Sequence, residues 1–132
     1  MQLSFSVPSS LIAGAFGLAL SGSLMAAQDE DFNFDTTEDL YQVCSTPASS
    51  PEAVPASFAC RAFIEATMQY HDEISDRKKM KRLVCYPQSA TIGDGRSAFV
   101  AWAKENAADK TLMGETPVVG VVRALAAKYP CK

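Results

Sequence analysis

The sequence is poor in the residues that most enzymes need for catalysis. It contains a single histidine, His71, among 132 residues. Nucleophilic triads and most general-base mechanisms require a histidine beside a serine or cysteine, and the four cysteines are expected to be oxidised. The closely spaced Cys-x-x-Cys pairs that favour a structural zinc site are also absent. We therefore expect a protein with no enzyme activity, no cofactor and no bound metal.

Charged side chains are absent from residues 1–27. The apolar run Leu11–Leu20 is broken only by Gly14 and Gly17, and small residues follow it up to an abrupt acidic stretch. This order predicts a secretory signal peptide over residues 1 to about 27. A membrane helix needs about 20 consecutive apolar residues, so a retained membrane anchor is the weaker alternative. We expect a periplasmic or secreted protein that has no membrane segment after processing.

No charge of one sign dominates the sequence, whose formal net charge is −3. This mild acidity favours neither nucleic acid nor a membrane surface as a partner. Removal of the signal peptide leaves about 105 residues, which is enough for one domain. We expect a flexible acidic N-terminus over residues 28–35 and a helical domain over residues 36–132.

Four cysteines, Cys44, Cys60, Cys85 and Cys131, lie in the expected mature chain. An even number of cysteines in a small exported domain indicates a disulfide framework. Zinc binding by these cysteines is the competing interpretation. Four cysteines allow three disulfide pairings, and their positions in the sequence alone do not choose among them.

Apolar residues recur at helical spacing and no alternating run is long enough for a strand, so we predict an all-α fold of four helices. Thr36 and Asp39 form the pattern of a capping box before the first helix. Ser57 is the expected N-cap of the second helix, and Thr116–Pro117 indicates the start of the fourth. The expected helices are residues 37–44, a second that follows Ser57 and has an uncertain end near Asp76–Arg82, a third that carries Phe99, Trp102, Ala103 and Asn106 with Thr91 or Asp94 as its cap, and a fourth over residues 117–129.

Apolar stripes predict which helix faces form the core. Phe99 and Trp102 are expected to fill it from the third helix. Gly93–Ser97 is expected to be a turn, because it lacks the preceding strand and the Gly-Lys-Ser/Thr ending of a phosphate-binding loop. The second helix presents Ala59, Phe63, Ala66, Tyr70 and Ile74, widened by Cys60 and Ile64. The fourth helix presents Val118, Val121, Val122, Leu125 and Tyr129.

The order of the helices favours one of the three disulfide pairings. Consecutive helices joined by short loops pack antiparallel. Cys44 closes the first expected helix and Cys60 opens the second, whereas Cys85 precedes the third and Cys131 follows the fourth. We therefore predict the disulfides Cys44–Cys60 and Cys85–Cys131.

A dense basic cluster follows the second helix. One interpretation is a solvated loop that balances the acidic region Asp29–Asp39. The alternative is an electrostatic contact surface for a protein partner. Nucleic acid is disfavoured because no aromatic residues are interleaved with the cations. The cluster consists of Arg77, Lys78, Lys79, Lys81 and Arg82.

Three short motifs together resemble a known family. They are Cys60-x-x-Phe63-Ile64, Cys85-x-Pro87 before a threonine-rich helix start, and Ala124-Leu125-x-x-x-Tyr129-Pro130-Cys131. Over residues 36–132 the chain resembles the Tai-type immunity proteins, which neutralise peptidoglycan amidase effectors delivered by type VI secretion. The chain has Phe63 and Ala66 where that family usually has tyrosine and glycine.

The resemblance implies an exported, all-helical protein without enzyme activity, which binds a cognate peptidoglycan amidase toxin and blocks its cleft with an inserted loop. Members are commonly dimeric, so a homodimer is a further expectation. The candidate contacts are the basic cluster Arg77–Arg82 and, further along the chain, three residues of the loop 109–115, namely Asp109, Lys110 and Glu115. Core packing explains neither segment. The alternative is a small helical disulfide protein with a general structural or stress-binding role in the cell envelope.

Overall fold

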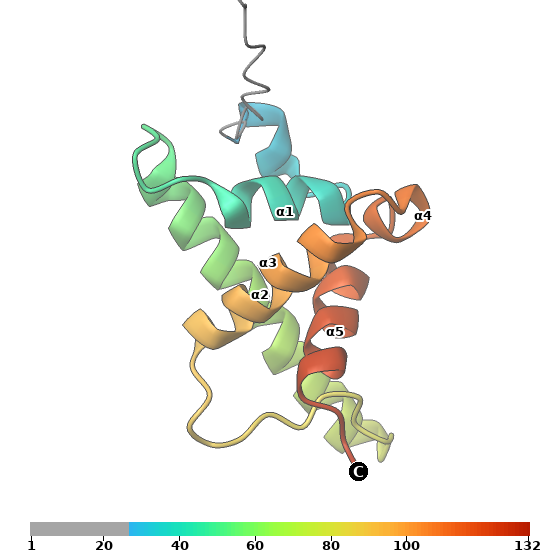
Figure 1. Cartoon of the computed structure of the whole chain (residues 1–132). Coiled ribbons are helices and arrows are strands. Elements are labelled where there is room, and N and C mark those ends of the chain that lie inside the picture. The colour runs from blue at the N-terminus through green and yellow to red at the C-terminus, as the bar shows by residue number, and fades with distance from the viewer. Residues whose placement is uncertain (1–26) are drawn as a thin grey trace, which may run out of the picture.

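The computed structural model describes residues 27–132, so all of the predicted signal peptide except Ala27 lies outside the described residues. The described part is helical (Figure 1), apart from loops and one isolated antiparallel bridge between Val84 and Pro130. Four main helices, α1, α2, α3 and α5, confirm the predicted all-α fold. The elements in chain order are η1 (Asp29–Asn33), α1 (Thr37–Ser45), α2 (Ala53–Lys78), α3 (Ile92–Asn106), α4 (Lys110–Met113) and α5 (Pro117–Lys128).

Each of the four main helices contacts the other three. Helix α1 lies across the upper end of the domain in Figure 1, above α3 and α5. Its residue Leu40 is fully buried together with Ile64 of α2, Phe99 of α3 and Val121 of α5. Because each main helix contributes a large apolar side chain to this buried cluster, the four helices share one hydrophobic core.

Side chains that were identifiable in the sequence fix two helix starts. The Asp39 N–H donates to Thr36 Oγ1 (3.2 Å), and the Thr36 N–H donates to the Asp39 carboxylate (2.8 Å). Thr91 forms the same reciprocal capping box at the start of α3. These bonds satisfy N–H groups that have no partner within the helix. Pro117 begins α5 as predicted, although the preceding threonine hydroxyl makes no capping bond.

Both predicted disulfides form. Cys44–Cys60 joins the end of α1 to α2, with Cα atoms 5.1 Å apart. Cys85–Cys131 joins the loop after α2 to the C-terminal end, with Cα atoms 4.9 Å apart. The Cys85 N–H also donates to the Tyr129 carbonyl (2.9 Å), next to the Val84–Pro130 bridge. The second disulfide therefore anchors the loop after α2 to the end of α5.

Helix α2 differs from its prediction at its start and on its buried face. It begins at Ala53 rather than after Ser57. Pro55 falls in the first turn, where a missing N–H leaves no intrahelical bond unmade. The predicted stripe was displaced around the helix, since Ala66 and Tyr70 are exposed, while Cys60, which is bonded to Cys44 of α1, lies on the buried face. The buried residues of α2 are Ala56, Cys60, Ile64, Thr67, Met68 and Ser75.

The acidic N-terminal segment contains a short helix. Residues 29–33 form η1, which starts with a capping box between Gln28 and Asp31. After it, Phe34 packs edge-on against Phe63 of α2, with ring centroids 5.2 Å apart. Two phenyl rings in this arrangement attach the segment to the domain.

Three differences from the prediction concern α3 and the chain that follows it. Gly93–Ser97 lies inside α3 rather than in a turn, because the capping box starts the helix before this segment. Trp102 is half-buried and not part of the fully buried core. The four-residue helix α4 has no counterpart in the prediction, and Asp109 caps its N-terminus.

Candidate functional site

His71 is nearly buried, and both nitrogens of its ring contact neighbouring polar groups. Its side chain is only 9% exposed, and its Nδ1 lies 3.0 Å from Asp72 Oδ1. The Leu83 N–H donates to His71 Nε2 (3.2 Å). Because Nε2 accepts this bond, the neutral ring carries its proton on Nδ1, directed at the carboxylate. Both ring nitrogens are therefore occupied in attaching the loop after α2 to the helix.

Asp72 is the centre of this small polar network. Its carboxylate accepts a hydrogen bond from the Tyr86 hydroxyl (2.5 Å), and Arg82 lies 3.9 Å away. Partial burial raises the pKa of Asp72, but the hydrogen bonds from Tyr86 and His71 and the positive charge of Arg82 outweigh burial, so its pKa lies below the ordinary value. The same hydrogen bond raises the pKa of Tyr86. The loop after α2 is thus held by His71, which accepts a bond from the Leu83 N–H, and by Asp72, which contacts Tyr86 and Arg82.

The basic cluster divides into paired and unpaired cations. Arg77 forms an ion pair with Glu73 on α2, and Arg82 donates to both carboxylate oxygens of Asp76 (2.9 and 2.8 Å). Lys78, Lys79 and Lys81 are exposed and form no ion pair with any described residue. Lys79 also ends α2 with a left-handed backbone at φ 53°. The unpaired charge of the cluster therefore resides on the three lysines.

The second candidate segment is engaged in local structure. Asp109 accepts bonds from two N–H groups at the start of α4 (3.0 and 3.1 Å), and Lys110 pairs with Glu38 at 3.5 Å. Glu115 accepts two hydrogen bonds from Arg123 (2.7 Å each), which lower the pKa of this glutamate. The structure does not bring the two candidate segments together. One precedes the start of α5, and the other leads into the bridge beyond its end.

An apolar surface lies along α5, and the sequence analysis missed it. Val118, expected in the core, is 45% exposed, while Met80 and Leu83 stand out from the basic loop at 58% and 57%. The sequence did contain a signal for this surface, because Met80 and Leu83 are apolar residues within or beside the run of cations. We call this surface the α5 groove. One part is lined by Leu83, Trp102, Leu112, Val118, Val119 and Val122, and the adjoining part adds Tyr70, Ile74 and Met80.

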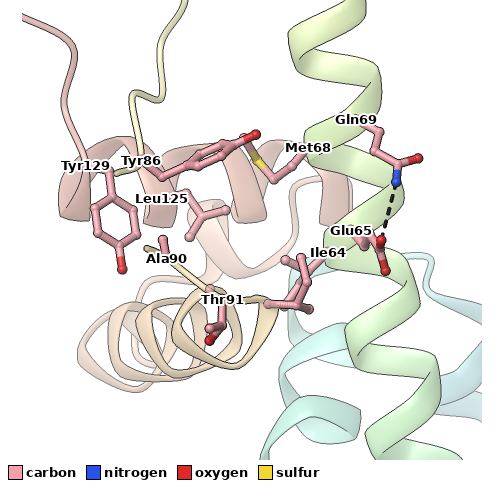
Figure 2. Close-up of a pocket in the computed structure, with 11 residues that line it drawn as sticks. Ile64, Glu65, Met68, Gln69, Tyr86, Ala90, Thr91, Leu125 and Tyr129 are labelled. Atoms are coloured by element: carbon pink, nitrogen blue, oxygen red, sulfur yellow. Dashed lines mark hydrogen bonds between the residues drawn. The ribbon is translucent and has the colours of Figure 1, made fainter. Parts of the chain in front are cut away.

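A separate small cavity of about 190 Å³ lies between α2, α3 and α5 (Figure 2). Ile64, Met68 and Leu125 line it with apolar side chains. Its polar residues include Glu65 and Gln69, which are hydrogen-bonded to each other at 3.4 Å. The cavity contains no histidine, cysteine or pair of carboxylates in its lining. In the described part of the chain, no group of histidine, cysteine and acidic residues is placed to bind a metal ion either.

The fold defines a small all-helical protein that is tied by two disulfides. A comparison with family models identifies it further: the model of the Rap1a immunity proteins matches residues 36–131, and the chain belongs to this family. This confirms an immunity protein, under the Rap1a name rather than the Tai-type name of the sequence resemblance. No curated protein and no solved structure matches the chain.

The family, the disulfides and the helices each say something about the protein. An immunity protein is not an enzyme, and it has a cognate effector as its partner. Its two disulfides indicate an extracytoplasmic compartment, because disulfides persist in oxidising environments. Within residues 27–132, no helix combines the length and apolar character required to span a membrane.

Proposed function

We propose that the protein is exported to the periplasm and there binds a peptidoglycan amidase effector of type VI secretion, occluding its active-site cleft. The observation that carries this proposal is the immunity-family match over residues 36–131. The Tai-type resemblance supports an amidase as the target, and the apolar, uncharged run before Gln28 supports cleavage of a signal peptide. A homodimer is the assembly that the same resemblance supports.

Occlusion requires a surface that fits the effector without any chemistry of its own. A standard protein interface buries about 800 Å² on each partner, which a domain of this size can supply. The candidate contacts are the lysines Lys78, Lys79 and Lys81, whose charge no described residue neutralises. Asp109, Lys110 and Glu115 are weaker candidates, since each of them already has a local partner.

Co-expression tests the proposal directly. The first observation needed is whether the neighbouring gene encodes a Cys/His amidase without a signal peptide. Such an amidase, directed to the periplasm, should lyse cells that lack this protein and spare cells that contain it. A version without residues 1–27 should not protect, because it would remain in the cytoplasm. An amidase with its active-site cysteine replaced provides the control for toxicity. Lysis with and without the immunity protein would remove the inhibitor function and leave the general envelope role.

The charged contacts have their own test. Replacing Lys78, Lys79 and Lys81 with serine, while keeping Arg82 because it holds the loop to Asp76, should weaken amidase binding and reduce its dependence on salt, because surface charges act mainly on association. Binding measured at low and high salt gives both quantities. Unchanged affinity at low salt would exclude the basic cluster from the interface.

A further inference from the structure

The exposed apolar side chains of the described chain are concentrated on one face. Eight large apolar residues are strongly exposed, and five of them line the α5 groove. Contiguous exposed apolar surface of this kind marks interaction sites on proteins. The five residues are Tyr70, Met80, Leu83, Val118 and Val119.

The loop that contributes Met80 and Leu83 is fixed before any partner binds. The Leu83 N–H is held by His71 (3.2 Å), and Arg82 is held by Asp76 (2.8 Å). The disulfide at Cys85 closes the loop on its other side. A surface that is ordered in advance loses little conformational entropy on binding. These exposed apolar side chains are therefore presented in a defined arrangement.

Charge distinguishes the two ends of the α5 groove. At the Met80 end, Lys78, Lys79 and Lys81 have no acidic partner among the described residues. At the α4 end, Glu38 and Glu115 are already paired with cations. These two glutamates are therefore not free to pair with the lysines of a second copy. The unpaired charge fits a partner that brings its own carboxylates.

We propose that the α5 groove is the docking surface of this immunity protein for an apolar protrusion of the effector, with acidic residues beside it that meet the three lysines. This inference rests on the proposed function and adds the location and chemistry of the contact. Apolar side chains at the centre of the interface supply most of the affinity, and the charges at its edge supply the association rate and orientation.

The test uses the neighbour-encoded amidase with its active-site cysteine replaced, immobilised for binding measurements. The double variant Met80→Ser/Leu83→Ser should bind at least about tenfold more weakly than wild type, mainly through faster dissociation. The matched control is Val54→Ser/Phe58→Ser, which removes apolar side chains that are somewhat more exposed (66% and 69%) near the start of α2. The control should bind like wild type, and thermal melts with intact disulfides should show that both variants fold.

Three results would overturn the inference, and they are distinguishable. Equal binding by wild type and the Met80→Ser/Leu83→Ser variant would exclude the α5 groove and leave the proposed function intact. A free protein that is dimeric, and becomes monomeric in this variant with no loss of effector affinity, would assign the groove to a second copy. A wild-type protein that neither binds nor protects would overturn the proposed function, and the docking surface with it.

Discussion

Gly120 marks a very close approach between α1 and α5, and it provides the sharpest test of the packing. A Cβ atom at this position would lie 2.4 Å from both Cγ2 and Oγ1 of Thr37. Carbon atoms in contact are about 3.5–4.0 Å apart, so Gly120→Ala requires a movement of about 1 Å. Thr37 is fully buried and its hydroxyl donates to the Glu115 carbonyl (3.0 Å), so it has little freedom to move aside.

The expected effect combines opposing contributions to the free energy of unfolding. Overpacking a core costs about 1–3 kcal/mol, and a rotation of Thr37 that breaks its hydrogen bond costs about 1 kcal/mol more. Alanine favours a helix over glycine by about 1 kcal/mol. We therefore expect Gly120→Ala to lower the free energy of unfolding by about 2 kcal/mol. For a domain of this size the corresponding fall in Tm is about 8–16 °C.

Urea and thermal unfolding, followed by circular dichroism with the disulfides intact, measure this effect. The control is Gly93→Ala in α3, where a Cβ would meet Thr91 Oγ1 at an ordinary 3.4 Å. That variant should be as stable as wild type or more stable. Combining Gly120→Ala with Thr37→Ala should recover about 1 kcal/mol relative to the sum of the single changes. A Gly120→Ala protein as stable as wild type would refute the reasoning.

Further predictions concern the disulfides, the helix caps and pH. Replacing the Cys85–Cys131 disulfide by serines should lower the free energy of unfolding by about 4 kcal/mol, because the bond spans 46 residues; a loss below about 1 kcal/mol in urea would contradict this chain-entropy estimate. Thr36→Ala should lose about 1 kcal/mol with its capping bond, whereas Thr116→Ala, whose hydroxyl caps nothing, should lose much less in the same melts. The lowered pKa of Asp72 stabilises the fold fully above the ordinary value of 3.8, and this contribution disappears as pH falls through the folded-state pKa. Asp72→Asn should therefore flatten the acid side of the stability profile, and an unchanged profile would exclude this linkage.

The starts of α1 and α5 and the disulfide pairing could be predicted because their causes are local or topological. A capping box joins residues three positions apart, so Thr36 was recognisable without knowledge of the fold. The pairing was predicted from the order of the helices along the chain, because Cys44 ends the first expected helix and Cys60 begins the second, while Cys85 and Cys131 flank the last two. The ion pair between Arg77 and Glu73 has the same local character, being four residues apart on one helix.

The buried faces of α2 and α5 could not be predicted in the same way. Both helices have apolar residues on more than one side, so spacing alone leaves the inward direction open. Val118 and Val121 are both apolar, yet only Val121 is buried, because the neighbouring helices decide which side is covered. The α5 groove has the same origin. It is created by residues distant in sequence, such as Leu83 and Leu112, that become neighbours only in the fold.

The position of the second disulfide connects the stability of the fold with the proposed binding surface. Cys85 lies two residues after Leu83, and its partner Cys131 fixes this part of the chain to the end of α5. On the other side, His71 and Asp76 hold the same loop to α2. In a reducing compartment only these polar contacts would remain, and a less ordered loop binds more weakly because binding must then order it. The oxidising compartment in which the proposed effector acts is therefore also the one in which the docking surface is complete.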